Sequence, residues 1–295
     1  GNEEEADRVG MQLLRRADFN PQGMPAFFEK LQKYSRYAAQ APEFLRTHPL
    51  TTNRIADSLA RVDASVPFDS YHESNTYKLI RTKLIVRSFD EPKLAIDHYS
   101  TALKNGEYSD DANIFKYGLA LAHQENRNYD MAAKLLDELL AINKNNTSYM
   151  LARADLEVQR GNYDHAIAIY ERMDKFFPDY RPLILSYANT LIIAKRPNDA
   201  IEVLEDYDRY HTPDITYYTY LAQAQAQSGN IIESSVANAE VYFLTGETRV
   251  AIQLLQDLIR RRNPVPDYYE EEKILSRISQ LETELRIERN MKLTR

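Results

Sequence analysis

Small residues recur at a constant spacing through the middle of the chain, each one just after a polar turn. The turns read NYDMA, GNYDHA, RPNDA and GNIIES, and they end at Ala132, Ala166, Ala200 and Ser234. The sequence numbers of these positions therefore rise by 34 at each step. A small residue lets two helices approach closely, and a polar turn starts the second helix. The pattern therefore predicts a stack of helical hairpins.

The same signature continues at the C-terminal end of this region, where the spacing halves. GETRVA ends at Ala251, a step of only 17 from Ser234. Half a period corresponds to one extra helix inserted in phase. Residues 230–244 are therefore predicted to be the second helix of one hairpin and the first helix of the next.

A looser signature, FDEPKLA, ends at Ala95 and predicts helices over residues 75–88 and 91–104. Within the regular repeats, Tyr170 occupies an aromatic position. Pro178 occupies a helix-ending position, because proline cannot continue the hydrogen-bond ladder of a helix. Together with the constant period, these features resemble the tetratricopeptide repeat. We predict a solenoid of about five hairpins over residues 75–262.

The segments on either side of the solenoid have other patterns. Residues 1–63 do not follow the period and predict helices over 5–17, 23–39 and a third ending near 63, with a linker at 64–74. In residues 263–295, one apolar helix face is predicted to cap the exposed end of the solenoid. Its members follow a 4-3-4 spacing: Ile274, Ile278, Leu281 and Leu285. The predicted fold class is all-α.

Composition limits the functions that this fold can carry. The chain has 295 residues, 43% of them hydrophobic, and a net charge of -7. Nucleic-acid binding is not expected, because it requires a basic face. No stretch has the roughly 18 consecutive apolar residues of a membrane span. The absence of cysteine excludes disulfides, thiol nucleophiles and cysteine-ligated metals.

Two motifs in the segment 1–63 add chemistry to this picture. The chain opens with EEEADRVGMQLLRRADFNPQGMPAFFEKL and continues to THPLTTNRIADSLA. In this order they resemble the end of a zinc metallopeptidase domain of the HExxH class, which includes HtpX and the CAAX prenyl endopeptidases. The resemblance is closer to the BepA-type periplasmic members, which carry C-terminal tetratricopeptide repeats.

The resemblance implies roles for four residues. Glu3 would be the third zinc ligand and Asp7 its partner one helical turn later, on the same helix face. His48, in the His-Pro loop, would lie over the metal and gate it, and Arg54 would hold a carboxylate near the cleft. Without the resemblance, the acids would be an ordinary helix start favoured by the helix dipole, and His48 an exposed loop histidine.

These 295 residues contain no HExxH sequence. A catalytic zinc needs about three protein ligands and a water molecule, and only Glu3 and His48 are candidates here. We therefore expect the chain alone to be inactive and to bind no stoichiometric zinc. We interpret it as the C-terminal part of a longer protease, in which zinc is the cofactor.

The repeat register predicts which residues face a partner from the inner groove. The set is mixed polar and apolar, and it lacks the Lys, Asn and Arg pattern by which some such repeats hold a C-terminal carboxylate. An extended or helical segment of a larger protein is therefore the expected ligand. The predicted groove residues are Tyr117, Leu121, Leu151, Asp155, Leu185, Asn189, Thr219 and Gln223.

The resemblance implies a periplasmic location and a role in outer-membrane protein assembly and quality control. The implied partners are the β-barrel assembly machinery and stalled outer-membrane proteins. A second hypothesis stays open, in which the chain is a free-standing tetratricopeptide adapter and Glu3 is an incidental helix-start acid.

Overall fold

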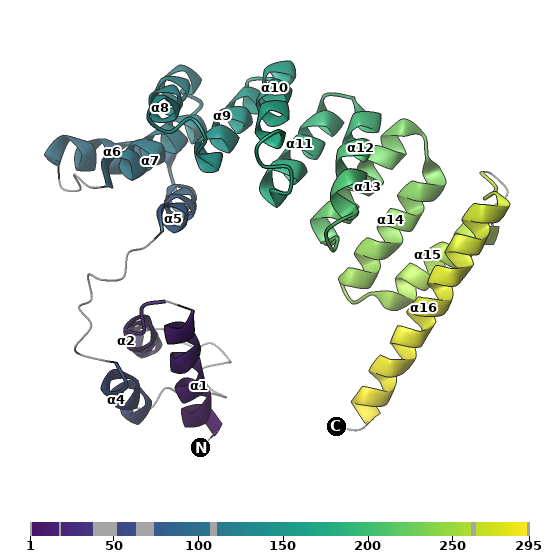
Figure 1. Ribbon diagram of the computed structural model, residues 1–295, viewed down its shortest axis with the longest axis horizontal. Helices are drawn as coiled ribbons and strands as arrows, with labels where there is room; N and C mark the ends of the chain where they lie inside the picture. Colours follow the sequence, from purple (N-terminus) through teal and green to yellow (C-terminus); the bar gives the residue numbers. More distant parts are fainter. Residues whose placement is uncertain are drawn as a thin grey trace. The chain divides into compact units, whose positions relative to one another are not determined.

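The computed structural model describes residues 2–17, 19–37, 52–62, 74–106, 111–260 and 264–293, and the regular elements among them are all α-helices (Figure 1). This confirms the predicted all-α class. The chain forms two compact units, Gly1–Tyr77 and Lys78–Arg295. None of the described helices combines the length and apolarity needed to cross a bilayer.

The helices described in residues 1–62 of the N-terminal unit are α1 (Asn2–Arg16), α2 (Gly23–Tyr37) and α4 (Thr52–Ala60). They correspond to the three helices predicted in residues 1–63. α4 packs against both α1 and α2. Each helix contributes a buried side chain to this unit, namely Met11, Phe28 and Ile55. The arrangement places the first turn of α1 near α4.

The C-terminal unit is a stack of helices that follow one another along an arc (Figure 1). Consecutive helices pack side by side from α6 to α16. The helices are α5 (Asn75–Arg87), α6 (Pro92–Asn105), α7 (Ala112–Glu125), α8 (Tyr129–Ile142), α9 (Thr147–Gln159), α10 (Tyr163–Asp174), α11 (Arg181–Ile193), α12 (Pro197–Asp208), α13 (Ile215–Ser228), α14 (Ile231–Leu244), α15 (Thr248–Arg260) and α16 (Tyr268–Leu293).

The small residues that define the period are buried between the helices. Ala132, Ala166 and Ala200 have no exposed surface, and Ser234 is 7% exposed. The hydroxyl of Ser234 donates a hydrogen bond to the backbone oxygen of Ala222 at 2.9 Å. Serine can replace alanine at this position because its polar group is satisfied inside the hairpin. The predicted close approach of paired helices is thus confirmed.

The turns inside the hairpins repeat the same backbone geometry. Each first helix is followed by one residue in the left-handed conformation. The backbone amide of the residue after it donates a hydrogen bond to the carbonyl five positions earlier in the chain. This arrangement is the Schellman motif. The Asn162 amide, for example, donates to the Glu157 oxygen at 2.8 Å. The left-handed positions step by 34 and then by 17: Arg127, Gly161, Lys195, Gly229 and Gly246.

Two of these turns carry a side chain at a position that favours glycine. Arg127 has φ 58° and Lys195 has φ 63°. Replacing either residue by glycine should stabilise the solenoid by about 1 kcal/mol, because the left-handed strain disappears. Thermal unfolding measures this effect. Gly161→Ala is the matched control, since its added methyl group meets open space and should cost a similar amount. An equal melting temperature for all three variants would contradict the claim that the left-handed conformation of Arg127 and Lys195 costs stability.

α5 differs from the prediction for the first hairpin. α6 packs along α7 and does not lie along α5 as a hairpin partner. Instead, Leu79 and Val86 of α5 are buried in the core that α6 to α9 share. α5 also forms one wall of a cavity on the first helices of the repeats.

The inserted helix and the final helix agree with the sequence. α14 packs against α13 on one side and α15 on the other, as predicted for residues 230–244. α16 lies against α15, and Ile274, Ile278 and Leu281 are buried in a shared core with Leu255 and Leu258. The predicted apolar face of the last helix therefore covers the end of the described repeat helices.

Candidate functional site

Arg54 joins the acidic residues of the opening motif into one cluster. Its Nε and Nη2 donate to the two carboxylate oxygens of Asp7 at 2.7 and 2.8 Å. Its Nη1 lies 3.2 Å from Oε2 of Glu3. The guanidinium also stands over the ring of Phe28, 5.3 Å from the ring centroid. The structure thus brings together three of the four residues for which the sequence predicted a role in the zinc site.

Local structure explains this arrangement. Glu3 and Asp7 are four residues apart on α1, so their side chains share a face. α4 supplies Arg54, whose side chain is 10% exposed, and Asp7 is 14% exposed. Hydrogen bonding to Asp7 raises the pKa of Arg54 and outweighs the opposing effect of burial. A two-pronged Arg–carboxylate contact of this kind fixes orientation as well as charge.

The zinc site that the sequence predicted has few candidate ligands among the described residues. Glu3 is 40% exposed and is a possible ligand, whereas both oxygens of Asp7 are engaged by Arg54. Among the described residues, no three His, Cys, Asp or Glu side chains are grouped so that they could hold a metal ion. His48 lies outside the described residues. A catalytic zinc ion needs about three protein ligands.

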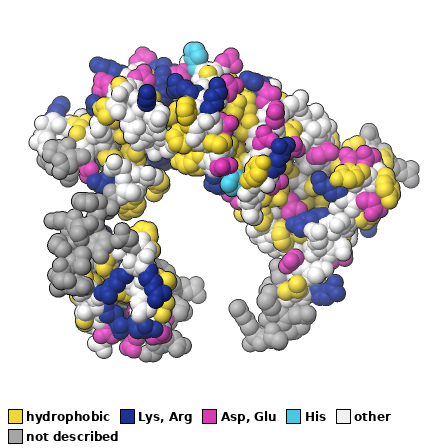
Figure 2. Space-filling model, in the orientation of Figure 1, with side chains coloured by type: hydrophobic (Ala, Val, Ile, Leu, Met, Phe, Trp, Pro, Cys, Tyr) yellow, Lys and Arg dark blue, Asp and Glu magenta, His cyan; other side chains and the backbone are white. Residues whose placement is uncertain are grey.

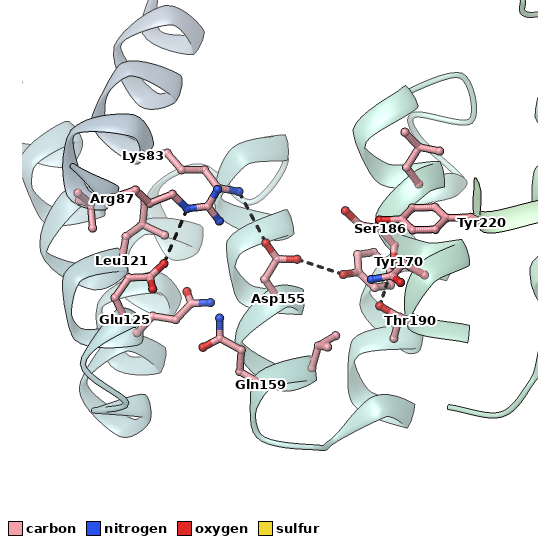
Figure 3. Close-up of a pocket in the computed structure, with 15 residues that line it drawn as sticks. Lys83, Arg87, Leu121, Glu125, Asp155, Gln159, Tyr170, Ser186, Thr190 and Tyr220 are labelled. Carbon is pink, nitrogen blue, oxygen red and sulfur yellow. Dashed lines mark hydrogen bonds and ion pairs between the residues drawn. The ribbon is translucent and has the colours of Figure 1, made fainter. Parts of the chain in front are cut away.

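A second candidate site is a cavity of about 240 Å³ on the face formed by the first helices of the repeats. We call this face the first-helix face; it comprises α7, α9, α11 and α13. Neighbouring members of this series contact one another. α5 closes the cavity on one side, and Figure 3 shows the side chains that point into it. The residues on this wall are Lys83, Val86 and Arg87.

The cavity contains half of the predicted groove residues. Leu121, Asp155, Leu185 and Asn189 line it. Tyr117 does not: it is 2% exposed and packs against Tyr149, with ring centroids 5.4 Å apart. It therefore cannot present its ring to a partner, and this part of the groove prediction is wrong.

The other three predicted groove residues also lie outside the cavity lining. Leu151 is partly buried and packs against the core that α9 to α13 share. Thr219 donates its hydroxyl to the backbone oxygen of Ile215 at 2.7 Å, and Gln223 is exposed on α13. Tyr220, one residue after Thr219, lines the cavity from α13 instead.

Charges of both signs meet inside the cavity. Lys83 Nζ lies 3.7 Å from Oδ2 of Asp155, and Arg87 Nε lies 3.8 Å from Oε1 of Glu125. Burial raises the pKa of the Asp155 carboxyl, while the charge of Lys83 opposes this shift. The hydroxyl of Tyr170 donates to Asp155 at 3.4 Å. The two cations from α5 therefore balance two carboxylates from the repeats.

The cations of α5 were missed from the sequence because α5 was expected to form a hairpin with α6. Lys83 and Arg87 lie four residues apart, so they share one helix face. That spacing was the available signal, but it could not reveal which surface the face would meet.

A wider cavity of about 740 Å³ lies among α12, α13, α14 and α16. Tyr218 lines it, and burial raises the pKa of this tyrosine to about 12. Arg277 of α16 donates to both carboxylate oxygens of Glu240 at 2.6 Å and stands over Phe243. These contacts attach α16 to α14. On the outer surface, acidic and basic side chains are interspersed over the visible face of the solenoid (Figure 2).

Comparisons with known proteins match both parts of the chain. A model of peptidase family M48 matches residues 1–62. Models of the tetratricopeptide repeat match residues 90–147, 117–181 and 157–224. The metallopeptidase resemblance and the repeats therefore occur in one chain, in the predicted order.

Several relatives carry the name beta-barrel assembly-enhancing protease, among them one from Escherichia coli K12 and one from Yersinia pestis. The one from Escherichia coli K12 is 34% identical over 257 residues, covering 86% of this chain and 52% of the relative. The one from Yersinia pestis is 32% identical over 262 residues, covering 88% of this chain and 53% of the relative. The chain thus spans about half the length of these relatives. It is a relative of the β-barrel assembly-enhancing proteases, and in it a segment that matches family M48 precedes tetratricopeptide repeats.

Proposed function

We propose that this chain is the partner-binding and substrate-binding region of a periplasmic zinc metalloprotease that acts in the assembly and quality control of outer-membrane proteins. The observation that carries the proposal is the similarity to β-barrel assembly-enhancing proteases, which runs through both the M48 segment and the repeats. The solenoid supplies the binding surface, as stacked repeats do in general. Its partners are the β-barrel assembly machinery and unfolded outer-membrane proteins.

In the longer protein, Glu3 is the third zinc ligand, and Asp7 and Arg54 are positioning residues. The support is geometric: Arg54 holds both oxygens of Asp7 and lies 3.2 Å from Glu3, so it fixes the first turn of α1. Bound zinc polarises a carbonyl and activates water. The HExxH histidines and glutamate would supply the remaining ligands and the general base.

Metal analysis tests this assignment. The 295-residue chain should retain far less than one zinc ion, because a catalytic site needs about three protein ligands. In the longer protein, Glu3→Gln should lower both bound zinc and peptide hydrolysis. Glu5→Gln is the matched control, since Glu5 pairs with Arg8 on the helix surface. Tight one-to-one zinc on the short chain, or full zinc in the Glu3 variant, would refute the assignment.

A gating role for His48 is a separate part of the proposal. A neutral imidazole in the His-Pro loop can occupy a position on zinc that substrate or water needs. In the longer protein, His48→Ala should therefore increase proteolysis. Unchanged proteolysis would remove the gating role and leave the roles of Glu3 and Arg54 intact.

A further inference from the structure

The lining of the cavity between α5 and the first-helix face is dominated by neutral groups that both donate and accept hydrogen bonds. The two cations and two carboxylates are already paired, at 3.7 and 3.8 Å. The remaining polar side chains come from five helices and are Gln124, Gln159, Tyr170, Ser186, Asn189, Thr190 and Tyr220. The hydroxyls of Tyr170 and Thr190 already donate to Asp155 and to the backbone oxygen of Ser186. The site therefore offers a ligand no net charge, but several hydrogen-bonding groups, among them side-chain amides.

One of these groups has an unmet hydrogen-bonding requirement. Gln124 is 6% exposed, and its Oε1 is buried without a hydrogen-bond partner among the described residues. A buried acceptor without a donor costs free energy. Gln124 lines the cavity, and the terminal torsion of glutamine is soft. The site therefore lacks a donor that a ligand can supply.

The polar groups also lie at regular intervals. Asp155 and Asn189 occupy equivalent positions on α9 and α11, one repeat period apart. Packed helices stand about 8–10 Å apart, and an extended chain advances about 3.3 Å per residue. A strand that crosses the face therefore meets a new helix about every three residues. Crossing from α7 to α13 takes roughly nine residues.

From this geometry we infer that the cavity binds the main chain of an extended polypeptide, whose amide and carbonyl groups pair with the side-chain amides of α7, α9 and α11. A peptide bond carries one donor and one acceptor, and the side chain of Gln or Asn can satisfy both. Recognition of this kind tolerates many sequences. The inference rests on the proposed function and specifies how the solenoid holds an unfolded substrate.

Binding of a blocked peptide of about nine residues, built from alternating serine and valine, tests the inference. The full chain is titrated with this peptide labelled with a fluorophore, with a second peptide of permuted order, and with a third methylated on three central amide nitrogens. The first two should bind equally well. The methylated peptide should bind at least about tenfold more weakly, because it has lost its donors. Unequal binding of the permuted peptide, or equal binding of the methylated one, would overturn the inference.

A substitution in the protein gives an independent readout. Gln124→Met removes the unpaired oxygen at nearly constant volume, so it should preserve or raise the melting temperature of the chain. The same substitution should weaken binding of the first peptide about tenfold. Asn189→Leu should weaken binding of the first peptide to a similar extent. Gln223→Met changes an exposed amide outside the cavity and should leave the affinity for this peptide unchanged. If Gln124→Met lowered the melting temperature but left the affinity for the peptide unchanged, the Gln124 oxygen would be binding a structural water molecule and not a ligand. That result would overturn the inference.

The outcome for an unfolded β-barrel protein separates this inference from the proposed function. If that protein binds the chain but the alternating peptide does not, the proposed function stands and main-chain recognition in this cavity fails. If neither binds, both fail.

Discussion

Replacing Arg54 by alanine should destabilise the N-terminal unit by about 3 kcal/mol, because it leaves a nearly buried carboxylate without its partner. Asp7 is 14% exposed and receives two hydrogen bonds from Arg54. Hydrogen exchange of the α1 and α4 amides measures the loss, since those helices meet through this contact. The repeat helices serve as an internal reference within the same sample.

Two variants make this experiment specific. Arg54→Lys keeps the charge but not the planar fork, so it should recover only part of the stability. Arg8→Ala removes an exposed pair with Glu5 and should leave hydrogen exchange in α1 nearly unchanged, because exposed ion pairs add little stability. If the alanine variant of Arg54 exchanged no faster than that of Arg8, the guanidinium would not hold α1 in place, and its proposed positioning role would fail.

Replacing Gly118 by alanine should destabilise the solenoid by about 2 kcal/mol, although alanine is the better helix former. A Cβ atom at Gly118 of α7 would lie 2.4 Å from Cε1 of the Tyr99 ring. Tyr99 of α6 is 3% exposed and also packs against Phe115, with ring centroids 5.8 Å apart. The ring therefore has no free space into which it can move. Thermal or urea unfolding of the chain measures the effect.

The double variant identifies the cause. In a Tyr99→Ala background the obstructing ring is gone, so adding Gly118→Ala should become stabilising by about 0.5–1 kcal/mol through helix propensity. Gly10→Ala is a matched control in α1, where the new methyl group meets only the flexible end of Met24 at 2.9 Å. A destabilisation that persisted without the Tyr99 ring would contradict the proposed steric cause.

Much of the fold follows from residues whose physical requirements are local. Ala132, Ala166 and Ala200 must be small because the helices of a hairpin touch there, and all three are fully buried. The half-period step to Ala251 correctly placed one helix between two hairpins. These features are readable in sequence because each depends only on the helix beside it.

The sequence could not predict where α5 packs, and the reason is physical. Leu79 and Val86 are buried, yet Tyr77, Ile80 and Leu84 are more than half exposed. The apolar residues of α5 thus lie on all sides of the helix. The sequence therefore does not distinguish the face that packs from the face that is exposed. The short connection to α6 favoured a hairpin, but the contacts of Lys83 and Arg87 lie on α9 and α7.

The candidate sites were predictable to different extents. The four-residue spacing of Glu3 and Asp7 predicted that both carboxylates share one face of α1, and in the structure both lie near Arg54. Of the predicted groove residues, Asp155 and Asn189 line the cavity, whereas Tyr117 is buried, because one repeat register cannot tell a surface position from the layer beneath it. The cavity also depends on α5, which lies outside that register.

The most direct test of the whole account is the binding of this chain to an outer-membrane β-barrel protein held unfolded in dilute urea. We expect saturable binding that Gln124→Met and Asn189→Leu weaken about tenfold and that Gln223→Met leaves unchanged, with no cleavage of the bound protein. Failure of the chain to bind the unfolded barrel protein at micromolar concentrations would contradict this expectation.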